Sequence, residues 1–96
     1  MTVFIAELIR AANETSKLSP IETARLLRRA AASIRDSRER IEARSPTHDP
    51  GHDIVFELTV MASSIDLFPR EKVAAMFLEA AQDLRASKML LEAKKA

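Results

Sequence analysis

The chain has 96 residues, of which 47% are apolar and 30% charged; this composition is too apolar for a disordered protein and allows one buried core. The absence of cysteine excludes disulfides, thiolate catalysis and cysteine-ligated zinc, and a net charge of +1 provides no overall field that attracts polyanions. No apolar run approaches the length of about 18 residues that a membrane helix needs. We therefore expect one cytoplasmic domain over residues 1–96 that has no membrane contact.

Two helices are predicted in the first half of the chain. Apolar residues recur at helical spacing from Phe4 to Ala12, which predicts a helix over about 3–15. A second helix is predicted over 20–44. It begins at a Ser-Pro-Ile-Glu motif (19–22), in which the serine can cap the helix and the glutamate can complete a capping box.

A loop and two further helices are predicted in the second half. Residues 45–52 contain two prolines and the only glycine, which indicates a break in helical structure. Asp53 can cap a third helix over about 54–66, and a fourth helix begins near Pro69 and runs to the low nineties. Short turns at 16–19 and 67–68 favour antiparallel pairing of the helices that they join.

The two halves resemble each other when they are aligned fifty residues apart. Ten of the 44 pairs formed by residues 3–46 and 53–96 are identical, whereas composition alone would give about four. The identical pairs are Glu7/Glu57, Leu8/Leu58, Ala12/Ala62, Ala24/Ala74, Ala30/Ala80, Ala31/Ala81, Arg35/Arg85, Ser37/Ser87, Glu42/Glu92 and Ala43/Ala93. A single hairpin of helices cannot bury its apolar stripe, but two facing hairpins can.

The predicted fold is therefore all-α. We expect a four-helix array of two duplicated antiparallel helical hairpins, related by an approximate internal two-fold axis. The first hairpin covers 3–44, the inter-repeat loop 45–52 and the second hairpin 53–96. The fifty-residue period fits none of the common helical solenoid repeats, so the repeat itself indicates no family.

Comparison of the hairpins reveals apolar residues in the second that replace polar or smaller residues in the first. Arg10 corresponds to Val60, Arg28 to Leu78, and Ala6 to Phe56. Helical spacing places the substituted residues on stripes away from the seams that we expect to face the core. In the second and fourth predicted helices, these seams are Ala24, Leu27, Ala31, Ile34, Arg38 and Ile41, and the residues fifty positions later. The predicted interface comprises Phe56, Val60, Leu67, Ala75, Leu78 and Met89. We expect these residues to form a contact with a second copy or with a helical protein partner, and the alternative is that the chain's own helices cover them.

Arginine is concentrated in the second predicted helix, which suggests nucleic-acid binding as an alternative function. The candidate basic face consists of Arg25, Arg28, Arg29, Arg35 and Arg40. Acidic residues are interleaved with these arginines, and no aromatic residue lies among them to stack on a base. A solvated face with local ion pairs is the simpler interpretation.

Neither catalysis nor a cofactor is indicated. His48 and His52 could supply imidazole ligands to zinc, nickel or copper, but the Pro50-Gly51 break prevents the helical geometry that would bring them together. We therefore interpret this segment as a polar turn, with no metal site, no cofactor site and no catalytic residues. The sequence predicts a non-enzymatic interaction or regulatory module that self-associates through the second hairpin.

Overall fold

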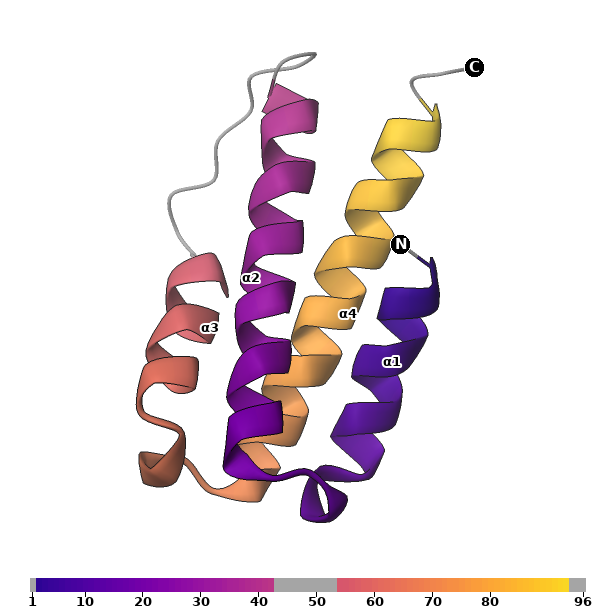
Figure 1. The fold of residues 1–96 in the computed structure, drawn as a ribbon. Coiled ribbons are helices and arrows are strands. Elements are labelled where there is room, and N and C mark those ends of the chain that lie inside the picture. Colours follow the sequence, from indigo (N-terminus) through magenta and orange to yellow (C-terminus); the bar gives the residue numbers. More distant parts are fainter. Residues whose placement is uncertain (1, 43–53, 94–96) are drawn as a thin grey trace.

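The described part of the chain consists of helices joined by short turns and carries no strand, as Figure 1 shows. The computed structural model describes residues 2–42 and 54–93, so the predicted inter-repeat loop 45–52 and the predicted cap Asp53 lie outside the described residues. The all-α prediction is confirmed. In chain order, the elements are α1 (Thr2–Asn13), the 3-10 turn η1 (Thr15–Lys17), α2 (Pro20–Glu42), α3 (Ile54–Ser63), the 3-10 turn η2 (Ile65–Leu67) and α4 (Arg70–Ala93).

Helix α2 begins at the capping box that its sequence predicts. The Ser19 hydroxyl oxygen accepts a hydrogen bond from the Glu22 backbone N–H at 3.1 Å, and a Glu22 carboxylate oxygen accepts one from the Ser19 N–H at 3.2 Å. Two N–H groups that lack helical acceptors are thereby satisfied reciprocally. Pro20 occupies the first helical position, where its missing N–H costs no helical hydrogen bond.

Replacing Ser19 by alanine should lower the free energy of unfolding by about 1 kcal/mol, because the Glu22 N–H loses its acceptor. Urea unfolding followed by circular dichroism measures the change. Ser16→Ala, at an exposed position in η1, is the matched control and should leave the midpoint unchanged. Equal effects of the two substitutions would show that the cap contributes nothing specific.

The two short helices end earlier than the sequence predicts, each giving way to a 3-10 turn. In α1 the last helical turn closes with a shared hydrogen bond, in which the Glu14 N–H donates to the Arg10 and Ala11 carbonyl oxygens. The chain then tightens through bonds three residues apart, such as that from the Lys17 N–H to the Glu14 carbonyl oxygen. Tightening of this kind is common at helix ends, where carbonyls lack helical donors.

The long helices α2 and α4 lie side by side and run in the same direction, with α1 and α3 on their flanks (Figure 1). Helix α1 packs mainly against α4, and α3 packs mainly against α2. The helices that are neighbours in sequence, α1 with α2 and α3 with α4, contact each other little. Packing thus runs mainly between the halves, rather than within each expected hairpin, and each half depends on the other to bury its apolar stripe.

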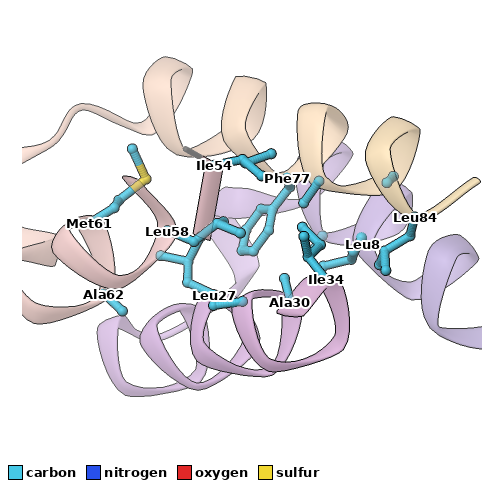
Figure 2. Close-up of a cluster of buried hydrophobic side chains, with 14 of the residues drawn as sticks. Leu8, Leu27, Ala30, Ile34, Ile54, Leu58, Met61, Ala62, Phe77 and Leu84 are labelled. Carbon is cyan, nitrogen blue, oxygen red and sulfur yellow. The ribbon is translucent and has the colours of Figure 1, made fainter. Parts of the chain in front are cut away.

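All four helices contribute to one core cluster. Figure 2 shows Phe77 of α4 in this cluster with Ile54 and Leu58 of α3 and Leu27 of α2, and all four side chains are fully or almost fully buried. Small alanines, including Ala30 and Ala80, are also buried on the long helices. Alanine on the buried face allows two helix backbones to approach closely, which suits the contact between α2 and α4.

Structural features recur at the spacing seen in the sequence. The turns η1 and η2 are fifty residues apart, as are the first residues of α2 and α4 and the last residues of α1 and α3. Burial follows the same spacing, since Leu27 and Phe77 are both fully buried, as are Ile34 and Leu84. At these described positions, residues fifty apart therefore occupy corresponding places in the helices.

Candidate interaction surface

A groove lies between the two neighbouring helices of each half. The first groove, between α1 and α2, has a rim of charged residues, and the second groove, between α3 and α4, has a rim that is half apolar and half charged. The rim of the first consists of Glu7, Arg10, Glu14, Glu22, Arg25 and Arg29. The rim of the second consists of Phe56, Glu57, Val60, Lys72, Ala75 and Glu79, and this groove has a volume of about 460 Å³.

The floors of the two grooves are apolar and correspond residue by residue. Ala11, Leu18 and Leu26 form the floor of the first, and they are buried or packed against the core. Their counterparts fifty residues later, Met61, Phe68 and Met76, form the floor of the second. The second floor thus carries two flexible methionines, a side chain that adapts readily to differently shaped partners.

Arg29 forms an ion pair across the first groove, between α2 and α1 of the same chain. Its guanidinium Nη1 lies 3.2 Å from Glu7 Oε2, which joins α2 to α1 across the groove. The guanidinium carbon also lies 4.5 Å from the centre of the Phe4 ring, within the range of a cation–π contact. Both charged side chains stay about half exposed, so the ion pair contributes little to stability, although it fixes the charge pattern of this rim.

The same two positions in the second groove carry like charges. Glu57 replaces Glu7 unchanged, but Glu79 replaces Arg29, so both sides of the groove present a carboxylate. Two carboxylates cannot form the ion pair that the first groove has. Among the described residues that line the second groove, Lys72 is the one cation, and it lies seven residues before Glu79 on α4.

The structure leaves the predicted interface residues exposed. The exposed fraction is 65% for Phe56, 39% for Val60, 80% for Leu67, 42% for Leu78 and 64% for Met89, and Ala75 is also exposed. The chain's own described helices therefore do not cover them. Phe56, Val60 and Ala75 come together on the rim of the second groove, whereas Leu67 on η2 and Leu78 and Met89 on α4 do not line it.

Leu90 of α4 is a further exposed apolar residue in the second half, with 53% of its surface accessible. Its counterpart Arg40 is charged, so the comparison of the halves contains the signal that identifies it. The floor residues of the second groove gave no such signal. Their counterparts in the first half are apolar too, so these positions show no change from polar to apolar between the halves.

Three of the five predicted arginines share one exposed line on α2. Arg25, Arg28 and Arg35 are exposed at spacings of three and seven residues, which place them on one side of the helix. Arg29 instead turns to Glu7 and Phe4. Arg40 pairs with Asp36 one turn earlier at 3.1 Å. The basic face is therefore narrower than the count of arginines suggests.

The described residues carry neither a cluster of metal ligands nor a membrane-spanning helix. Within 2–42 and 54–93, no three histidine, cysteine or acidic side chains gather closely enough to hold a metal ion. His48 and His52 lie outside the described residues. None of the described helices combines the length and the apolar character needed to cross a membrane.

The chain matches no protein family, no curated protein and no solved structure with which it was compared. Its function is therefore inferred from its own surface.

Proposed function

We propose that this protein is a non-enzymatic interaction module that self-associates through the apolar face of its second half. This second-half face is defined by Phe56, Val60, Leu67, Ala75, Leu78 and Met89. The observation that carries the proposal is their exposure, given that their counterparts are mostly charged. The symmetric homodimer is the most common oligomer of soluble proteins, and a second copy of the chain is the partner that we propose.

The energetic argument rests on the large side chains of this face. Full burial of one Leu, Met or Phe side chain stabilises an assembly by about 1.5–3 kcal/mol. Phe56, Leu67 and Met89 each expose well over half of their surface, and Leu78 a little less than half. Several large apolar side chains exposed in one half of a protein are typical of a contact site. The corresponding surface of the first half carries Lys17, Arg28 and Glu39 and offers no comparable gain.

We also propose that the two halves arose by duplication of a helical pair, and that only the later copy acquired the apolar face. The matching positions of turns, helix ends and buried residues support this history. Under this proposal both halves build the core, and only the second half supplies the contact. A regulatory role would then act through helix–helix contact, without chemistry at either half.

Light scattering across a range of concentrations tests the proposal. The wild-type mass should approach twice the chain mass of 10.7 kDa at high micromolar concentration. Leu78→Glu should raise the dissociation constant at least about tenfold, because a charge is brought into the contact. Its matched control, Arg28→Glu, changes the corresponding position of α2 and should leave the dissociation constant unchanged. A wild-type protein that stays monomeric throughout would refute the proposal.

A second candidate function is nucleic-acid binding along α2, supported by the shared exposed line of Arg25, Arg28 and Arg35. Contacts with phosphates would weaken steeply as salt is raised. Fluorescence polarisation with a labelled duplex at low salt should then give binding that the triple replacement of these arginines by glutamine removes. A lack of binding by the wild-type protein at low salt would exclude this function.

A further inference from the structure

We infer that the second groove receives helix α4 of a second copy in antiparallel orientation, with the two-fold axis passing near Ala75 and Met76. The inference rests on the proposed self-association and specifies its geometry. The evidence is the order of charges on the rim of the second groove and the difference between these charges and those of the first groove.

The first groove shows which positions face each other across such a groove. Arg29 of α2 reaches Glu7 of α1 at 3.2 Å, so these two positions lie at one level. Their counterparts, Glu79 and Glu57, both line the second groove. The second groove therefore has a carboxylate on each wall at this level.

Lys72 lines the same groove seven residues away from Glu79, a separation of about 10.5 Å along α4. The groove thus has an acidic level at Glu57 and Glu79 and a basic level at Lys72. Ala75 and Met76 lie midway between the two levels. When a second copy of α4 runs in the opposite direction, its basic level therefore faces the acidic level of the first copy, and its acidic level faces the basic one.

An antiparallel second copy of α4 satisfies this pattern twice. Lys72 of the second copy would meet Glu57 and Glu79 of the first, and the reverse contact would follow by symmetry. A carboxylate accepts several hydrogen bonds, so a lysine from outside adds to the existing contacts of these side chains. A parallel arrangement would instead place Lys72 against Lys72 and the carboxylates against each other. Charge complementarity therefore selects the antiparallel pair.

The apolar residues of the groove suit the same occupant. Ala75 at the crossing point is small enough for two helix backbones to approach, and Met76 can adjust to the incoming surface. Phe56 and Val60, on the opposite wall, would cover the inserted helix from the α3 side. The first groove cannot accept a helix in this way without displacing Arg29, which already supplies the cation from within the chain.

Charge reversals test this register. Lys72→Glu should place an additional acid on the acidic level of the partner, and Glu79→Lys should place a lysine against the partner's basic level. Each single variant should raise the homodimer dissociation constant at least about tenfold, since each changes both symmetric sites. Mixing the two variants should give a dissociation constant well below that of either variant alone, because one groove of the mixed dimer regains the wild-type contacts and the other pairs the introduced glutamate with the introduced lysine. Sedimentation velocity measures all four samples.

Glu71→Lys and Arg85→Glu are the matched controls, because they reverse charges at exposed positions of α4 outside the groove lining. Both should dimerise like the wild-type protein, and circular dichroism should show equal helix content in all variants. A failure of the mixture to associate would overturn the antiparallel register. The register would also be overturned if both single reversals left the dimer intact while Leu78→Glu dissociated it. That result would leave the proposed self-association standing. A monomeric wild-type protein would instead remove both.

Discussion

Replacing Phe77 by alanine should lower the free energy of unfolding by about 3–5 kcal/mol. The Phe77 side chain is fully buried within the core cluster to which all four helices contribute (Figure 2). Removal of the ring both loses its transfer free energy and leaves a cavity that its neighbours fill only in part. Chemical denaturation in urea, fitted to a two-state transition, measures the change.

The size of this effect matters because domains of this kind are stable by about 5–15 kcal/mol in total. A single substitution could thus remove a third or more of the stability. The adjacent substitution Leu78→Ala, on the exposed side of α4, is the control and should cost less than about 1 kcal/mol. If Phe77→Ala were as mild as Leu78→Ala, the cluster in Figure 2 would not be the core of the molecule.

Replacing Phe56 by glutamate should abolish self-association, with a dissociation constant at least about a hundredfold above that of wild type. The substitution removes the largest side chain of the second-half face and brings a charge into a surface that the proposed dimer would bury. Folding should be unaffected, because Phe56 lies on the exposed side of α3. Sedimentation velocity measures the association, and urea unfolding at a concentration where both proteins are monomeric compares their stabilities.

Ala6→Glu is the matched control for Phe56→Glu. Ala6 is exposed on α1 at the counterpart position, so the same charge is introduced on the equivalent surface of the first half. The control should associate like the wild-type protein. If both substitutions weakened association equally, the contact would not be specific to the second half.

The sequence predicts the helices well where their signals are local. The capping box of Ser19 and Glu22 predicts the start of α2, and both predicted hydrogen bonds are present. Of the predicted seam of α2, Ala24, Leu27, Ala31 and Ile34 are buried, as their three- and four-residue spacing indicates. Arg38, also in that seam, is only partly buried, and the side chain of Ile41 lies outside the described part. These features depend on neighbours in the same helix, and a sequence contains that information directly.

The packing partners of the short helices could not be predicted in the same way. A short turn indicates that two helices run antiparallel, but it does not determine which long helix each short one contacts most closely. The structure pairs α1 with α4 and α3 with α2, and it leaves a groove on the other side of each short helix. Ser37 and Ser87, identical in both halves, are buried on the long helices, although serine itself indicates no core position.

The candidate surface was predictable only in part, because the identity of its residues is in the sequence but their arrangement depends on how the helices pack. Comparison of the halves places Phe56, Val60 and Leu78 on an apolar surface away from the core, and the structure shows all three exposed. It could not predict that Phe56 and Val60 share a groove with Ala75 while Leu78 lies outside its lining. Which side chains converge depends on the distance between α3 and α4, and that distance is set by packing across the whole core.

Chemical-shift changes on dilution test the central claim most directly, since they locate a contact as well as detect it. Amide resonances of a labelled wild-type sample would be followed from millimolar to low micromolar concentration. The proposed dimer predicts shifts concentrated in α3, η2 and α4, while the counterpart residues of α1 and α2 stay unchanged. Shifts confined to α1 and α2, or no shifts at any concentration, would contradict self-association through the second half.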